Sequence, residues 1–202
     1  MLYSPLLSEL KWLDHGFGTR TDSIPQETMA SLKQIHSGNV LIGEQIGCAG
    51  EGDALVTSHA GVPVSVRTAD CYPILLADDR NRVVAAVHAG WRGTAAHIAI
   101  RTLEEMHRLY GTEAADVYAA IGPGIGECCY EVGADVARQF GQEHAGRIDL
   151  AAINRRQLLD SGVAEARIDV LGGCTKCDAH LFHSYRRDQS AAGRMVSYIA
   201  RP

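Results

Sequence analysis

Apolar runs alternate with short polar or glycine-rich segments along the whole chain. The two strongest runs, residues 73–77 and 83–87, are almost wholly apolar, a pattern that is typical of strands buried on both faces. The polar segment between them, residues 78–81, has the length and the Asp/Asn content of a turn. We therefore predict that these two runs are adjacent strands of a central hairpin.

The other runs predict further strands and helices around this hairpin. Residues 1–20 indicate a strand with an irregular end, and the four glycines within residues 43–52 predict a loop. Shorter apolar runs predict strands at residues 40–42, 53–57, 62–66, 117–121, 168–171 and 195–199. Helical spacing and start signals predict helices at residues 25–33, 94–110, 131–140 and 150–161.

Strands outnumber helices in this pattern, and the helices follow the central strands. The expected fold class is therefore α/β, or α+β, with helices packed on a mixed β-sheet. No internal repeat, low-complexity segment or linker divides the chain, so we expect one domain over residues 1–202.

The composition narrows the class of protein. At 46% apolar and 21% charged residues, the chain is expected to be a soluble globular protein. The net charge of −5 gives no footprint for nucleic acid or an anionic membrane, and no apolar run approaches the roughly 20 residues of a membrane helix. The first residues lack a basic, then apolar, signal-peptide pattern, so we expect a cytoplasmic protein. In such a compartment six cysteines are free thiols, metal ligands or core residues.

Cys71 and His88 are the leading candidates for chemistry. Cys71 precedes one apolar run of the hairpin and His88 ends the other, so antiparallel pairing places both at the same end. Thiolate and imidazole are preferred zinc ligands, and a catalytic zinc keeps three protein ligands and one open position. His36, at a polar boundary next to a predicted strand, is the best candidate for the third ligand. The alternative is a small core cysteine and a strand-end histidine bonded to backbone.

Two charged neighbours extend this candidate site. Asp70 is suited to act as a general acid or base, or to orient a histidine ligand, although a turn residue that bonds its own backbone has the same pattern. Arg92, within His88-Ala-Gly-Trp-Arg-Gly93, lies at the start of the strongest predicted helix, where an anion such as phosphate is favoured. The alternative for Arg92 is a solvated side chain at a strand-to-helix turn.

Two further motifs are less specific. Glycines at positions 122, 124 and 126 form a strand-to-helix loop without the spacing of a dinucleotide-binding fingerprint. Cys174, Cys177, His180 and His183 form a C-x-x-C followed by H-x-x-H, which suits a small zinc site or a redox pair, but the spacing between the pairs is too short for a usual zinc finger.

Several short motifs occur in a fixed order along the chain. They are Lys33-Gln-Ile-His36, Gly52-Asp-Ala-Leu-Val-Thr57, Thr68-Ala-Asp-Cys71-Tyr-Pro, His88-Ala-Gly-Trp-Arg-Gly93, Ile121-Gly-Pro, Cys129-Tyr-Glu-Val132 and Ser184-Tyr-Arg-Arg-Asp188. Together they resemble the YfiH-like family, also called the laccase-domain or polyphenol oxidase-like family, whose members are described as purine nucleoside phosphorylases. The resemblance extends from about residue 16 to residue 197.

The resemblance implies a single-domain YfiH-like fold and a Zn²⁺ ion held by His36, Cys71 and His88. It implies phosphorolysis of adenosine, inosine and methylthioadenosine, with deamination of adenosine as a companion reaction. The substrates would be a purine nucleoside and phosphate, with phosphate or substrate contacts from Gln34 and from the arginines Arg20, Arg92 and Arg186. Asp70 is the expected proton carrier of the deamination, since zinc deaminases pair the metal with a carboxylate.

Other interpretations stay open at this stage. Copper-dependent phenol oxidation is disfavoured, because three ligands do not supply several copper centres. Editing of peptidoglycan precursors would use Cys71 as nucleophile with His88 as base. A non-catalytic zinc-stabilised binding module is a third possibility, and the chain is a monomer or a homodimer. The segment 21–32 is shorter than is usual in the family, which implies a different cleft or substrate choice.

Overall fold

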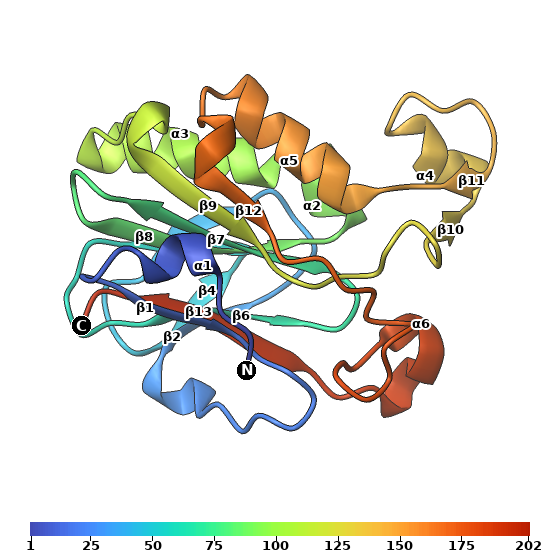
Figure 1. Cartoon of the computed structure of the whole chain (residues 1–202), viewed down its shortest axis with the longest axis horizontal. Coiled ribbons are helices and arrows are strands. Elements are labelled where there is room, and N and C mark those ends of the chain that lie inside the picture. Colours follow the sequence, from blue (N-terminus) through green and yellow to red (C-terminus); the bar gives the residue numbers. More distant parts are fainter.

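The computed structural model describes residues 1–202, and its central layer is a six-stranded sheet (Figure 1). The strand order is β12-β9-β7-β8-β5-β3. Parallel pairs stand at both edges, β3 with β5 and β9 with β12, whereas the central strands pair antiparallel. The strands are β3 (Val40–Ile42), β5 (Ala54–Thr57), β7 (Tyr72–Asp78), β8 (Val83–Ala89), β9 (Val117–Ile121) and β12 (Ile168–Val170).

A second, five-stranded sheet lies against one face of the first, with the order β1-β13-β6-β2-β4. It is also mixed, since β2 runs parallel to both β6 and β4 while β13 runs antiparallel to β1 and β6. Its strands are β1 (Asp14–Phe17), β2 (Ala30–Lys33), β4 (Gly47–Glu51), β6 (Val64–Thr68) and β13 (Met195–Ala200).

Helices cover the other face of the six-stranded sheet (Figure 1). The main ones are α2 (Trp91–Ala95), α3 (Ile98–Tyr110) and α5 (Leu150–Asp160). The two-stranded ribbon of β10 (Glu131–Val132) and β11 (Gly146–Arg147), with α4 (Ala134–Arg138), extends from one end of the molecule. The short helices α1 (Pro5–Ser8) and α6 (Tyr185–Asp188) complete the fold, and no helix is long and apolar enough to span a bilayer.

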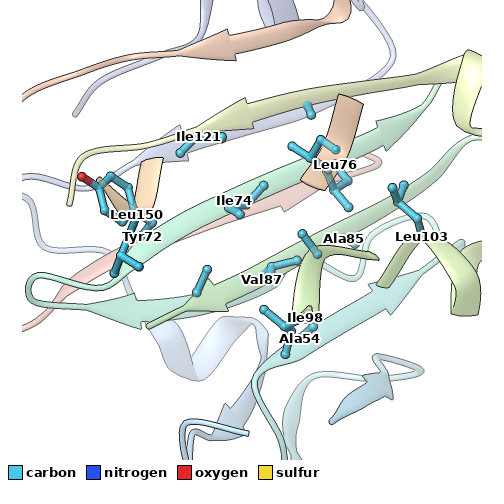
Figure 2. Packing of buried hydrophobic residues seen from close by; sticks show 14 of the residues in the cluster. Ala54, Tyr72, Ile74, Leu76, Ala85, Val87, Ile98, Leu103, Ile121 and Leu150 are labelled. Carbon is cyan, nitrogen blue, oxygen red and sulfur yellow. The ribbon is translucent and has the colours of Figure 1, made fainter. Parts of the chain in front are cut away.

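Alternation along β7 and β8 explains these three layers. Ile74 and Leu76 of β7 belong to the apolar cluster under α3, shown in Figure 2, while Leu75 belongs to the cluster between the two sheets. In β8, Val87 faces the helices and Ala86 faces the second sheet. Strands buried on both faces carry apolar residues at every position, which is why the two runs in the sequence are continuous.

The predicted fold class and the central hairpin are confirmed. β7 and β8 pair in the expected antiparallel register, and β9, α5, β12 and β13 lie where the sequence predicted strands and a helix. The single sheet envisaged from the sequence is instead two stacked sheets. Residues 1–20 form α1 as well as β1, and the predicted loop at 43–52 contains the edge strand β4.

The predicted helix at residues 25–33 is wrong. Only Gln26–Thr28 form a short 3₁₀ turn, and Ala30–Lys33 form β2. The reason is visible in the burial of β2, in which Ala30 and Leu32 are buried and the alternate residues Ser31 and Lys33 are not. This period of two belongs to a strand, and it decides the structure because both side chains fill the core between the sheets.

Two other predicted helices are shorter than expected. The helix expected at residues 94–110 is two helices, α2 and α3, because His97 adopts a left-handed conformation with φ of 57° between them. The helix expected at residues 131–140 begins with strand β10, and only α4 is helical.

Candidate metal centre and cavity

The hairpin register brings Cys71 and His88 together at one end of the central sheet. Pro73 pairs with His88 and Tyr72 with Ala89, so Cys71, directly before β7, lies beside the end of β8. His36 reaches the same point from the segment after β2, in a left-handed conformation with φ of 59°. The ligand atoms of these three residues, which we call the histidine–cysteine triad, lie within 4.8 Å of one another. The structure thus gathers the three residues that the sequence marked as ligands.

Asp53 holds both histidines of the triad in place. Its buried carboxylate lies 2.8 Å from Nδ1 of His88 and accepts the backbone N–H of His36 at 3.0 Å. The backbone N–H and hydroxyl of Ser37 bond the second oxygen of Asp53 at 2.5 and 2.7 Å. A hydrogen bond from Nδ1 of His88 to Asp53 leaves Nε2 free to bind a metal, the arrangement in which a carboxylate orients a ligating histidine. Asp53 was not predicted as a site residue, although it lies within the Gly52-Asp-Ala-Leu motif.

The charges of this cluster alternate. Burial would raise the pKa of the Cys71 thiol, but hydrogen bonds with His36 and His88 outweigh burial and bring this pKa to about 6. Burial would lower the pKa of His88, but Asp53 and Cys71 raise it to about 9. Burial likewise opposes ionisation of Asp53, whose pKa is nevertheless about 2 because His88 and Ser37 bond its carboxylate. Cys71 is therefore stabilised as a thiolate, the form that binds metals and acts as a nucleophile.

The absence of a side chain at Gly90 makes room for the triad. A Cβ atom at this position would lie 2.8 Å from Sγ of Cys71 and 3.2 Å from Cδ2 of His36. The backbone of Gly90, with φ of −80°, is one that any residue can adopt, so the requirement for glycine here is one of space.

The triad lies at a cavity of about 800 Å³. Such a volume is within the range of small-molecule sites. Its lining combines aromatic rings with cationic side chains. The lining residues are Gln34, His36, Arg67, Ala69, Asp70, Cys71, His88, Trp91, Ile125, Tyr130, Tyr185, Arg186, Ala192 and Arg194.

Asp70 is held firmly in the cavity wall. Its Oδ1 accepts the hydroxyl of Thr175 at 2.7 Å and its Oδ2 accepts the backbone N–H of Arg186 at 2.6 Å. Its φ of 87° is unusual for a residue other than glycine. Strained backbone held by surrounding contacts is often found at functional sites, and here the bonds from Thr175 and Arg186 fix the direction of the Asp70 carboxylate.

The structure also places the other residues singled out from the sequence. Gln34 and Arg186 line the cavity, but the amide of Gln34 bonds the backbone N–H and carbonyl of Arg67, both at 2.8 Å. Arg92 is exposed, is not part of the cavity lining, and stacks 4.4 Å from the ring centre of its neighbour Trp91. Arg20 also lies outside the lining, where it donates a hydrogen bond to the carbonyl of Ala179.

Several lining residues were missed by the sequence analysis. Arg67 lies in β6, and Arg194 directly precedes β13, so both belong to the region of the five-stranded sheet and not to the central hairpin. Tyr130 directly precedes β10, and Tyr185 is the first residue of α6. The guanidinium of Arg186 lies 5.3 Å from the ring centre of Tyr130. Only the folded arrangement brings these segments to one cavity.

Comparisons with known proteins show which proteins this chain is similar to. A purine nucleoside phosphorylase of Deinococcus radiodurans is 44% identical over 187 residues, which cover 87% of this chain and 71% of that protein. A protein of an unknown prokaryotic organism named adenosine deaminase RL5 is 39% identical over 163 residues, 74% of this chain and 62% of that protein.

Solved structures give the same relationship. The crystal structure of YlmD from Geobacillus stearothermophilus has a TM-score of 0.89 at 28% identity and covers 98% of this chain and 94% of that one. That of the hypothetical protein YfiH from Bacillus licheniformis has a TM-score of 0.88 at 25% identity, covering 95% and 94%. Residues 19–202 match the family model described as multi-copper polyphenol oxidoreductase laccase. The chain therefore belongs to this YfiH-like, laccase-domain family.

Proposed function

We propose that this protein is a zinc-dependent enzyme of purine nucleosides, which catalyses phosphorolysis of adenosine, inosine and methylthioadenosine and deamination of adenosine. The observation that carries the proposal is the opening of a Cys/His/His ligand set into a cavity lined by aromatic and arginine side chains. Relatives named purine nucleoside phosphorylase and adenosine deaminase support it.

The donor set of the triad fits one zinc ion. One thiolate and two imidazoles with a free coordination position facing a cavity are the ligands of a catalytic zinc, and Asp53 supplies the carboxylate that orients His88. When bound there, zinc would act as a Lewis acid and lower the pKa of water. Multicopper oxidation requires several copper centres and more histidines than the two of the triad.

The cavity walls fit the two substrates of phosphorolysis. The rings of Trp91, Tyr130 and Tyr185 offer apolar surfaces on which a purine can stack. Arg67, Arg186 and Arg194 offer the guanidinium groups that bind phosphate in a fork-like geometry. In our proposal these three arginines hold the attacking phosphate, and Arg92 and Arg20 act from outside the cavity lining.

Phosphorolysis and deamination place different demands on the same residues. In phosphorolysis a phosphate oxygen bonds the anomeric carbon of ribose, the bond to the purine nitrogen breaks, and its electron pair leaves with the purine, which takes up a proton. In deamination water replaces the amino group of adenosine, and a carboxylate carries protons between water and the departing ammonia. We assign this proton transfer to Asp70, whose carboxylate is fixed by Thr175 and Arg186.

A second candidate function rests on a different aspect of the same geometry. Cys71, His88 and Asp53 form a thiol–imidazole–carboxylate series in which Asp53 orients His88. This is the arrangement of a cysteine nucleophile with its base and orienting acid. Under this alternative Cys71 would attack an amide or ester carbon, as in the editing of peptidoglycan precursors. A non-catalytic zinc module is the third alternative.

One experiment separates these functions. Purified protein is analysed for metals and incubated with adenosine with and without phosphate, and adenine, hypoxanthine and inosine are separated as products. We expect bound zinc, phosphate-dependent adenine, inosine from deamination, and loss of all turnover after chelation with recovery on adding Zn²⁺. The same assay is repeated after thiol alkylation. The Cys48→Ser protein, which lacks an exposed cysteine outside the cavity, controls for alkylation at that position.

Other results would select the alternatives. Activity that survives chelation but not thiol alkylation would favour the cysteine nucleophile, with the peptide or ester substrate still to be supplied. Bound zinc without turnover of any nucleoside, together with a large loss of stability on chelation, would favour the binding module. The first outcome contradicts the zinc dependence of the proposed reaction, and the second contradicts the nucleoside phosphorylase itself.

A further inference from the structure

Four cysteines converge outside the cavity. Two come from the segment that precedes β10, and two come from the segment that follows β12. Their sulfur atoms all lie within 4.8 Å of one another, with Sγ of Cys177 at 3.3 Å from that of Cys129 and 3.7 Å from that of Cys128. None is in a disulfide. We call this group the four-cysteine cluster: Cys128, Cys129, Cys174 and Cys177.

The backbone around the cluster holds the two segments together. Gly124 and Cys174 form an isolated parallel β-bridge, and the N–H of Thr175 donates to the carbonyl of Gly124 at 2.9 Å. The N–H of Gly126 points at Sγ of Cys174 at 3.3 Å, and the N–H of Asp178 bonds the carbonyl of Cys174 at 3.0 Å. The position of Cys174 is therefore fixed by main-chain bonds, and hydrogen bonds to sulfur of this kind orient and stabilise thiolate ligands.

We propose that the four-cysteine cluster is a tetrathiolate site for a soft divalent metal ion, and that this ion is Zn²⁺. Four thiolates in a tetrahedron are a typical structural zinc site. With Zn–S bonds of about 2.3 Å, neighbouring sulfur atoms lie about 3.8 Å apart, close to the separations that the cluster shows. The site is distinct from the triad, and it neither requires nor implies the proposed function.

The other ligands of this site are not the histidines that the sequence suggested. The C-x-x-C of Cys174 and Cys177 precedes an H-x-x-H, but neither His180 nor His183 belongs to the group of converging ligands. The ring of His183 lies instead against Gly193, where a Cβ atom would come within 2.5 Å of it. The second pair of thiols comes from Cys128 and Cys129, more than forty positions earlier in the chain.

The location of the cluster suggests a structural role for its metal. Thr175, between the two cysteines of the C-x-x-C, is fully buried and donates its hydroxyl to Asp70 in the cavity wall. On the other segment, Ile125 and Tyr130 flank the first pair of cysteines and line the cavity. A metal ion that crosslinks the two segments would therefore hold one wall of the cavity against Asp70.

A disulfide is the main competing structure. Cys177 lies close to both Cys128 and Cys129, so oxidation would join one pair, remove two hydrogen atoms and leave the other two thiols unpaired. Four convergent sulfurs are more than a disulfide needs and are the number that closes a structural zinc site. The two structures differ in metal content, in free thiols and in mass.

The test begins with the intact protein loaded with ¹¹³Cd²⁺, whose chemical shift moves downfield with each sulfur ligand. We expect one resonance in the tetrathiolate region, and this measurement does not depend on the folding of any variant. Zinc content is then measured for the wild type and for Cys177→Ser, Cys71→Ala and Cys48→Ser, with circular dichroism as a check of folding. If both sites bind zinc, we expect two ions per chain in the wild type and Cys48→Ser, and one in each of the other variants.

The two proposals fail in different ways. If the triad binds no zinc, the wild type and Cys71→Ala will both hold one ion and Cys177→Ser none, which leaves the tetrathiolate site intact. If the folded Cys177→Ser protein keeps the zinc content of the wild type, the tetrathiolate site is overturned. Absence of a tetrathiolate cadmium resonance overturns it too. So does a purified protein whose mass is two hydrogens lower and which has four free thiols, because one disulfide removes two of the six thiols.

Discussion

The triad and the four-cysteine cluster are built on different parts of the molecule. Two members of the triad adjoin the ends of β7 and β8, whose strand residues are all buried, and a buried Asp53 holds the histidines. The cluster lies on two irregular segments, and Cys128 and Cys177 are exposed. The sheet framework fixes the triad before any metal binds, whereas we expect metal to contribute much more to the order of the cluster.

This difference separates two uses of a metal site. A catalytic site benefits from ligands that keep their geometry without the ion, because an open coordination position must face the substrate. A structural site contributes its binding free energy to the local fold, so its ligands can stand on segments that have little other packing. Substitutions at each site can show whether the triad and the cluster divide in this way.

The largest expected effect is at the thiol of the triad. Cys71→Ala should lower nucleoside turnover by on the order of 10³-fold or more, because it removes a proposed metal ligand. The melting temperature should change little, since the sheet framework does not depend on the ion. Turnover and thermal unfolding of Cys71→Ala and Cys48→Ser measure both effects. Wild-type turnover in Cys71→Ala would remove Cys71 from the active site.

The second effect tests the carboxylate behind the triad. Asp53→Asn should weaken zinc binding by about 10- to 100-fold, as is typical when the partner of a ligating histidine is changed. Asp78→Asn is a matched control, because Asp78 is equally buried and bonds the backbone N–H groups of Arg80 and Asn81 at the far end of the hairpin.

Both aspartate variants should lose about 1–3 kcal/mol of stability, since each buried carboxylate satisfies backbone donors. Only Asp53→Asn should change the zinc dissociation constant, which competition with a chromogenic chelator measures. Equal zinc affinities in the two variants would show that Asp53 acts on the fold alone.

The same contrast explains what could be predicted from the sequence. The register of Cys71 and His88 followed from two continuous apolar runs and a short turn, since antiparallel pairing leaves little freedom. Arg67 and Arg194 could not be found in this way, because they reach the site through the stacking of two sheets. Asp53 directly precedes β5 in the central sheet, where β5 pairs with β8, but no short turn joins these two strands and sets their register. The four-cysteine cluster was half visible as a C-x-x-C, but its partners come from a segment that only tertiary structure places nearby.

Errors in the fold have the same physical origin. The segment at residues 25–33 has a proline at a position suited to a helix start, yet burial of Ala30 and Leu32 between the sheets makes it a strand. Long-range packing overrode local preference there. The long helix expected at residues 94–110 failed at His97, whose left-handed φ has no counterpart in apolar spacing.

A third, smaller effect tests the space inside the triad. Gly90→Ala keeps an allowed backbone but places a Cβ atom 2.8 Å from Sγ of Cys71. The ligands must move by tenths of an ångström, at a cost of about 1–2 kcal/mol, or roughly tenfold in zinc affinity. Gly146→Ala, where the nearest atom is the flexible Gln142 side chain at 3.4 Å, is the control. Calorimetric titration of both variants with Zn²⁺ checks this, and equal affinities would show that the triad is not rigid.

The smallest effect addresses the contact that joins the two regions. Thr175→Val removes the hydroxyl that Asp70 accepts at 2.7 Å and keeps the shape of a fully buried side chain. Loss of this bond should raise the activation free energy of deamination by about 1 kcal/mol, because Asp70 is held less firmly. This corresponds to about a fivefold lower kcat. Thr175→Ser keeps the hydroxyl and should restore the wild-type kcat. Thr102→Val, at a buried threonine that bonds the Ile98 carbonyl within α3, controls for stability.

The important comparison is between kcat and metal content in Thr175→Val. If the cluster only fixes the cavity wall, zinc content stays at the wild-type level while kcat falls, because the change lies between the two sites and touches the ligands of neither. A fall in zinc content would mean that the Asp70 contact also holds the four-cysteine cluster together. An unchanged kcat with unchanged zinc would separate the two regions altogether, and the cluster would then stabilise the fold without tuning the cavity.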